Sequence, residues 1–220
     1  METIEFVNDV PSNGQCKAWI LLSHGAGAPM TSPFMNEIAA LIAVRGIGVS
    51  RLEFSYMAER RITGKRRPPP KAERLTTEFV AAVETLRNDP QRTGLPLLIG
   101  GKSMGGRVAT LAADTLFAEG KITGAVALGY PFHPPGKPQS LRTAHLEDLK
   151  APLLIVQGER DSLGSRPQIM NYSLSPSVQI AWATDGDHDL APRKSSGTTH
   201  QSNLAAAADA IAGFVERLAP

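Results

Sequence analysis

Short apolar segments along this chain alternate with longer segments in which apolar residues recur every three or four positions. The short segments lack the strict alternation of apolar and polar residues that is typical of a strand with one solvent-exposed face, so they predict buried strands. They cover residues 18–22, 47–54, 95–99, 122–128, 152–157 and 178–183, and residues 4–7 are a weaker candidate for an edge strand.

The longer segments carry apolar stripes at the spacing of an amphipathic helix. The stripes are Phe34, Ile38, Leu41 and Ile42; Leu75, Phe79, Val83 and Leu86; Val108, Leu111, Ala112 and Leu116; and Leu204, Ala208, Ile211, Val215 and Leu218. Buried strands separated by such helices predict a mainly parallel sheet of about six to seven strands with helices on both faces. We therefore expect an α/β fold in which residues 1–220 form a single domain.

Composition narrows the class of protein further. The chain has 220 residues, of which 42% are hydrophobic, and this is enough for one sizeable core. Cys16 is the only cysteine, so an internal disulfide is excluded. The first residues lack the basic and apolar pattern of a signal peptide, and no segment is apolar enough to span a bilayer, so we expect a cytoplasmic protein without a membrane partner. A net charge of +2 is too small to indicate a nucleic-acid partner.

The segment Gly101-Lys102-Ser103-Met104-Gly105 carries the first candidate chemistry. It has the G-x-S-x-G pattern, follows a predicted strand and precedes a predicted helix, which is the setting of a nucleophile elbow. A serine on such a tight turn projects its hydroxyl into a cleft, and the flanking glycines make the turn sterically accessible. The pattern alone is short, and a glycine-rich turn without chemistry would also produce it.

Two nucleotide-binding patterns that resemble these glycine-rich segments are excluded. A phosphate-binding loop ending at Ser103 would need glycine at position 96, where the chain has Pro96. A dinucleotide fingerprint beginning at Gly25 would need a third glycine at position 30, where the chain has Met30.

A serine nucleophile needs a base to remove its proton and a carboxylate to orient that base. Asp161 follows the predicted strand 152–157, and His188 follows the predicted strand 178–183. Ser103, Asp161 and His188 thus appear in the order typical of α/β-hydrolases, each beyond the end of a strand. We expect these three residues to be catalytic.

Other residues compete for the same roles. Among the five histidines, His133 is the strongest alternative to His188, because it also follows a strand and could contact substrate. Glu159 lies two positions from Asp161 and is an alternative carboxylate. His24 lies in a glycine loop that is better suited to supplying backbone donors.

The oxyanion of an acyl-transfer intermediate needs two backbone N–H donors. Met104, directly after the serine, should supply one, and Ala26 in the glycine loop after the predicted strand 18–22 should supply the other. This chemistry requires no metal and no organic cofactor.

The loops beyond the strand ends are unusually basic. Windows 24–33, 55–71, 101–104, 130–145, 158–167 and 184–200 together hold thirteen Lys or Arg against six Asp or Glu. Ligands of such folds bind beyond the carboxyl ends of the strands, and converging positive charge attracts anions, so we expect a preference for anionic substrates. The candidate substrate-binding residues are Arg60, Arg61, Arg66, Arg67, Arg193, Lys194 and His133.

These motifs together resemble the α/β-hydrolase superfamily, close to its compact dienelactone-hydrolase-like members. More narrowly, SHGAGAPM at 23–30, RLEFSYM at 51–57, KRRPPP at 65–70 and GYPFHPPGKP at 129–138 are similar to predicted hydrolases of the family that includes testis-expressed and NSL-complex subunit 3 proteins. Some members of that family serve as complex subunits. Dienelactone hydrolases use a cysteine nucleophile, whereas this elbow carries Ser103, so the resemblance implies their layout rather than their substrate.

The connection after the predicted strand 122–128 is too short for a large cap domain, so the cleft should be open and should suit small esters. The leading expectation is a serine hydrolase that cleaves small carboxylic esters or thioesters through an acyl-enzyme on Ser103. The alternative is a non-catalytic binding or scaffold protein that uses the basic segment 60–70 as a contact surface.

Overall fold

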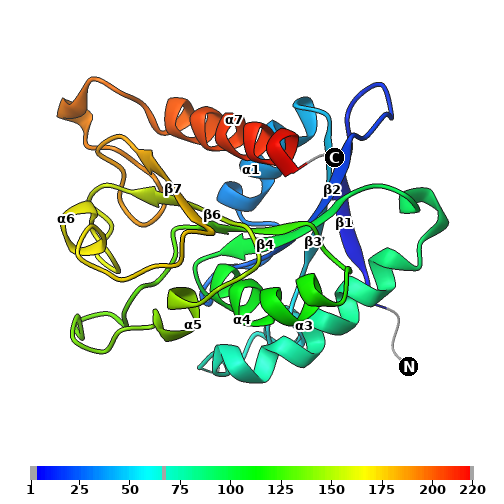
Figure 1. Cartoon of the computed structure of the whole chain (residues 1–220), viewed down its shortest axis with the longest axis horizontal. Helices are drawn as coiled ribbons and strands as arrows, with labels where there is room; N and C mark the ends of the chain where they lie inside the picture. Colours follow the sequence, from blue (N-terminus) through cyan, green and yellow to red (C-terminus); the bar gives the residue numbers. More distant parts are fainter. Residues whose placement is uncertain (1–3, 66–67, 219–220) are drawn as a thin grey trace.

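The computed structural model describes residues 4–65 and 68–218, and its strands form one sheet of seven in the order β1-β3-β2-β4-β5-β6-β7 (Figure 1). Neighbouring strands pair in parallel except for β1, which runs antiparallel to β3. The strands are β1 (Phe6–Asp9), β2 (Ala18–Ser23), β3 (Ile47–Leu52), β4 (Leu97–Lys102), β5 (Gly124–Leu128), β6 (Leu153–Gly158) and β7 (Val178–Ala183). The expected mainly parallel sheet is confirmed.

Helices cover both faces of this sheet, as the apolar stripes predict. In Figure 1, α1 and α7 lie on one face, and α3 and α4 lie on the other. The helices are α1 (Pro33–Val44), α2 (Ser55–Thr63), α3 (Ala72–Arg87), α4 (Met104–Ala118), α5 (Ala144–Glu147), α6 (Arg166–Ile169) and α7 (His200–Leu218), with short 3₁₀ turns η1 (Pro90–Arg92) and η2 (Lys194–Ser196).

Each face of the sheet has its own apolar core. Strands β2 and β4 are buried along their whole length and contribute side chains to both cores. Leu21 and Ile99 pack with α3 and α4, whereas Ile20 and Leu98 pack with α1 and α7. Successive strand residues therefore face opposite layers, which explains why these segments read as continuous apolar runs.

Two expectations about the sheet edge and the rim differ from the structure. The edge strand begins at Phe6 rather than at residue 4, because cross-strand contacts fix the later residues: Asn8 accepts a hydrogen bond from Ser50, and Asp9 pairs with Arg51 at 2.9 Å. The window 55–71, taken as a loop, begins with helix α2, and Gly64 caps the end of this helix with a left-handed φ of 70°. Glycine adopts that conformation without a steric penalty and so closes the helix.

The rim of the sheet has no large cap. The connection between β5 and β6 contains only the single-turn helix α5. Within the described ranges, no helix is both long and apolar enough to cross a membrane.

Candidate active site

Ser103 occupies a strained turn between β4 and α4. Its backbone has φ of 52° and ψ of −113°, which a residue with a side chain rarely adopts. The flanking glycines allow this turn to press against the end of β2. A Cβ added to Gly101 or to Gly105 would lie only 2.5 Å from the carbonyl oxygen of Ser23. The two glycines of the motif are therefore required by close packing as well as by the turn.

The three predicted catalytic side chains form one hydrogen-bonded chain. His188 Nε2 lies 2.8 Å from Ser103 Oγ, and His188 Nδ1 lies 2.8 Å from Asp161 Oδ2. A carboxylate only accepts, so Nδ1 carries the proton and donates to Asp161. This leaves Nε2 free to accept the hydrogen bond of the serine hydroxyl. The three residues come from the ends of β4, β6 and β7.

Two further hydrogen bonds hold the Asp161 carboxylate, one to each of its oxygens. Its side chain is fully buried. Oδ1 accepts a hydrogen bond from the Leu163 N–H at 2.8 Å, and Oδ2 accepts one from Gln157 Nε2 at 2.9 Å. Gln157 is also fully buried, and its Oε1 accepts the N–H of Tyr130 at 2.7 Å. A buried amide thus fixes the carboxylate and ties it to the end of β5.

Lys102 holds the loop that carries His188. Its buried ammonium donates to the backbone oxygen of His188 at 2.7 Å and pairs with Asp189 Oδ1 at 3.1 Å. Burial lowers the pKa of Lys102, and the nearby Asp189 carboxylate opposes that shift. The residue before the nucleophile therefore positions the backbone next to the base.

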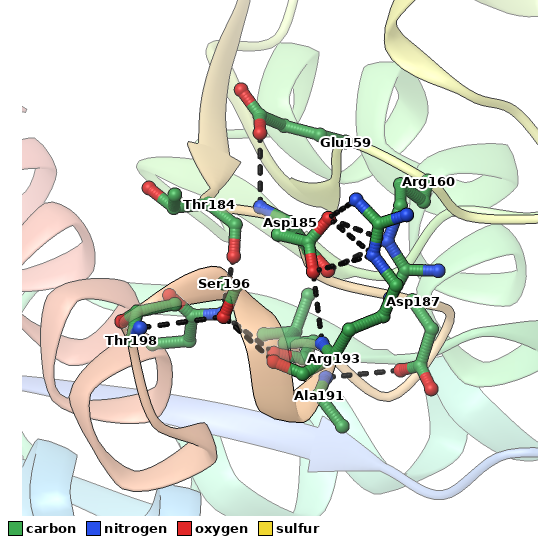
Figure 2. A network of polar contacts seen from close by, with 11 residues as sticks. Glu159, Arg160, Thr184, Asp185, Asp187, Ala191, Arg193, Ser196 and Thr198 are labelled. Atoms are coloured by element: carbon green, nitrogen blue, oxygen red, sulfur yellow. Dashed lines mark hydrogen bonds and ion pairs between the residues drawn. The ribbon is translucent and has the colours of Figure 1, made fainter.

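A polar network braces the same loop from outside (Figure 2). Asp185, which has φ of 49°, forms ion pairs with Arg160 at 2.9 Å and with Arg193 at 2.5 Å. The N–H of Asp185 donates to Glu159 at 2.9 Å, and Asp187 accepts the N–H of Ala191 at 2.9 Å. The network joins both ends of the segment that presents His188.

The glycine loop after β2 is fastened by its carbonyl groups. His24 Nε2 accepts the N–H of Phe54 at 3.1 Å, so its Nδ1 donates to the oxygen of Gly25 at 2.7 Å. The Tyr56 hydroxyl donates to the oxygen of Ala26 at 3.2 Å. Burial lowers the pKa of His24, which favours the neutral ring that this pattern needs. In the part of the chain that the structure describes, neither the Ala26 N–H nor the Met104 N–H donates a hydrogen bond.

Two cavities meet at the nucleophile. We call them the apolar cavity and the basic cavity, and both are lined by Ser103 and Ala26. The apolar cavity has a volume of about 480 Å³ and the basic cavity a volume of about 690 Å³. Other residues of the apolar cavity include Ala28, Pro33, Phe34, Met35, Lys102 and His188. Other residues of the basic cavity include Lys71, Glu73, Met104, Arg107, Leu141 and Arg142.

Comparison with known proteins identifies the family. The model of the alpha/beta hydrolase domain family matches residues 16–216. The chain belongs to this family. A dienelactone hydrolase from Anabaena variabilis shares the fold of this alpha/beta hydrolase, with a TM-score of 0.71 and 21% identity over 96% of this chain and 89% of that one.

Two further structures share the fold of this alpha/beta hydrolase at lower identity. Est1E from Butyrivibrio proteoclasticus, solved with ferulic acid bound, has a TM-score of 0.69 and 14% identity over 97% of this chain and 94% of that one. A serine hydrolase without lid from Xanthomonas campestris has a TM-score of 0.67 and 17% identity over 98% and 89%. The narrower resemblance to testis-expressed and NSL-complex subunit proteins stays a prediction.

Three of the predicted substrate-binding cations line neither cavity of this alpha/beta hydrolase. Arg61 pairs with Glu53 at 2.9 Å, and Arg193 is bound to Asp185. Lys194 is exposed in η2. None of these cations lines the apolar or the basic cavity. Much of the basic rim is therefore neutralised by its own ion pairs.

Four further residues were expected to bind substrate. Arg60 donates to the oxygen of Gly27 at 3.3 Å and so contacts the glycine loop rather than a cavity. His133 is buried, its Nδ1 lies 3.0 Å from the Pro134 oxygen, and it lines neither cavity. Arg66 and Arg67 lie outside the described residues.

Sequence reasoning missed the residues that support this site. In the sequence, Lys102 occupies a variable position of the elbow motif and Gln157 ends a predicted strand, and neither place indicates a supporting role in the site. Arg107 and Arg142 gave no local signal, because one lies within a predicted helix and the other within a long loop. Across residues 4–65 and 68–218, no three His, Cys, Asp or Glu side chains form a cluster suited to a metal ion.

Proposed function

We propose that this alpha/beta hydrolase is a serine hydrolase that cleaves small carboxylic esters or thioesters through an acyl-enzyme. The single observation that carries this proposal is the continuous hydrogen-bonded chain from Ser103 through His188 to the buried Asp161, with 2.8 Å at both steps. That arrangement activates a serine for attack at a carbonyl carbon.

In the proposed first half-reaction, Ser103 Oγ attacks the carbonyl carbon while His188 Nε2 takes the hydroxyl proton. Negative charge develops on the former carbonyl oxygen, and the N–H groups of Met104 and Ala26 are the donors suited to stabilise it. His188 then passes its proton to the departing alcohol or thiol. Asp161 orients the ring and stabilises its positive charge without taking the proton.

In the second half-reaction, His188 deprotonates a water molecule that attacks the acyl-enzyme. The oxyanion forms again at the same place, and the proton returns to Ser103 as the acid leaves. The lack of a large cap leaves Ser103 open to water and to small substrates. The name of the dienelactone hydrolase that shares this fold agrees with ester chemistry, because a lactone is a cyclic ester.

Labelling with a fluorophosphonate probe tests this function directly. The purified protein should label, whereas Ser103→Ala should not, and His188→Ala should label at least about 100-fold more slowly because the serine loses its base. Ser140→Ala is a matched control, since Ser140 lines the basic cavity beside Ser103. Equal labelling of the wild type and of Ser103→Ala would instead favour a binding protein that uses segment 60–70.

A further inference from the structure

The basic cavity presents more positive charge than its own residues neutralise. Lys71, Arg107 and Arg142 line it, and Glu73 is the only acidic residue among the described lining residues. Glu73 Oε1 accepts a hydrogen bond from Arg107 Nη2 at 2.6 Å, so one guanidinium is matched. The wall keeps an excess of positive charge beside the nucleophile.

Arg142 is the unmatched guanidinium. No side-chain or backbone group of the described residues accepts a hydrogen bond from it, although the residue is half-buried. Burial, and secondly the charge of Arg107, lower the pKa of Arg142. Arg107 Nε is itself buried without an acceptor. A half-buried guanidinium without an acceptor of its own favours the binding of an anion, because hydrogen bonds between charged groups are the strong ones.

Hydrogen bonds from both sides anchor the backbone of Arg142. Its N–H donates to the oxygen of Phe132 at 2.8 Å, and its carbonyl oxygen accepts the hydroxyl of Tyr130 at 2.8 Å. Tyr130 and Phe132 are fully buried, and their rings pack edge to face with centroids 4.9 Å apart. The loop after β5 is therefore anchored at Arg142, which keeps the base of this side chain at the wall of the basic cavity.

We propose that Arg142, assisted by Arg107, binds a carboxylate carried by the substrate, so that the preferred substrates are half-esters of small dicarboxylic acids. A planar guanidinium matches a carboxylate with two parallel hydrogen bonds. Ser103 and Met104 line the same cavity, so a carboxylate a few bonds from the ester carbonyl can reach Arg142 while the carbonyl lies at the nucleophile. This inference rests on the proposed function and names its substrate class.

The test compares charged and neutral esters of the same length by proton release. Monoethyl adipate and monoethyl glutarate are the charged substrates, and ethyl hexanoate and ethyl pentanoate are the neutral ones. Arg142→Met should lower kcat/KM for the charged esters at least 10-fold and change the neutral esters less than 2-fold. Arg142→Lys should fall between Arg142→Met and the wild type. Arg74→Met removes an equal charge from the exposed surface of α3, outside both cavities, and should change neither.

A binding measurement separates this inference from the proposed function. Calorimetry with adipate on the Ser103→Ala variant needs no turnover, and Arg142→Met in that background should weaken adipate at least 10-fold. Fluorophosphonate labelling without adipate binding would overturn the carboxylate site and leave the hydrolase. Adipate binding without labelling would support the site and overturn the hydrolase. Equal losses of kcat/KM for charged and neutral esters in Arg142→Met would also overturn the carboxylate site. Thermal unfolding of each variant checks that it is folded.

Discussion

The apolar cavity and the basic cavity share Ser103 and Ala26 but differ in how their charges are used. In the apolar cavity the Lys102 ammonium is already paired within the protein, because it donates to the His188 carbonyl oxygen and forms an ion pair with Asp189. In the basic cavity Arg142 has no such partner among the described residues. A cation at a cavity wall therefore points to an anionic ligand only where no group of the protein already pairs with it.

This difference divides the cleft into two chemical sides. The apolar cavity, with Pro33, Phe34 and Met35, suits a short aliphatic group, because removing apolar surface from water is favourable. The basic cavity suits a carboxylate. The same nucleophile thus faces a side that favours apolar groups and a side that favours anions.

The largest loss of kcat should come from substituting Asp161, because it supports His188 whichever cavity the substrate occupies. Asp161→Asn should lower kcat by roughly 10³- to 10⁴-fold for charged and neutral esters alike, because the buried amide would favour the wrong tautomer of His188. Steady-state kinetics on both ester classes measures this. Glu159→Gln is the control, and its kcat should stay within about 3-fold of the wild type, since Glu159 contacts none of the three catalytic side chains and its partly exposed pair with Arg166 contributes little. Comparable losses in both variants would contradict the assignment of Asp161.

Lys102→Met should act on the base rather than on substrate binding. Loss of the ammonium frees the carbonyl of His188, so kcat should fall roughly 10- to 100-fold with little change in KM. Lys102→Arg should restore much of the loss. A rise in KM alone would show that Lys102 binds substrate instead.

Phe34→Ala should change the acyl-chain preference of the apolar cavity alone. The Phe34 ring lines the apolar cavity and lies 5.3 Å from Lys102 Nζ. Its removal enlarges the cavity enough to bury about one more methylene of a longer acyl chain, which is worth about 0.8 kcal/mol, so kcat/KM for ethyl hexanoate should rise roughly 3- to 5-fold relative to ethyl acetate. Leu141→Ala truncates an exposed apolar residue in the basic cavity and should leave this ratio unchanged. The same shift in both variants would contradict the division into two sides.

The contrast between the cavities also separates what the sequence could predict from what it could not. The order of Ser103, Asp161 and His188 along the chain places all three at one edge of a parallel sheet, because the strands before them end there. The sequence shows how many basic residues the rim contains, but it does not show which of them form ion pairs, because folding brings their acidic partners to them. Asp185 lies eight positions before Arg193 and binds it, whereas Arg142 is brought against α4 by the packing of Tyr130. Which cation stays free is a property of tertiary structure.

The smallest effect should come from Asp185, which braces only the loop that carries His188 and Asp189. Hydrogen bonds from Arg193 lower the pKa of Asp185 to about 2, below the value of about 3.9 expected in the unfolded chain. The folded state therefore binds this proton less readily, so the stabilisation is fully present above about pH 4 and is lost as pH falls through about 2. Asp185→Asn should lower Tm slightly at pH 7, and this difference should shrink steadily as the pH falls from about 4 toward 2.

Asp209→Asn is the matched control for this last substitution. Asp209 forms an exposed pair with Arg45 at 2.6 Å, between α7 and α1 and outside both cavities. Hydrogen bonds from Arg45 also lower the pKa of Asp209, so its effect on Tm should likewise fade in acid. Only Asp185→Asn should also reduce kcat, by about 2- to 5-fold and for both ester classes, because it loosens the base. A loss confined to charged esters would instead place Asp185 in substrate binding and would break the division between the two cavities.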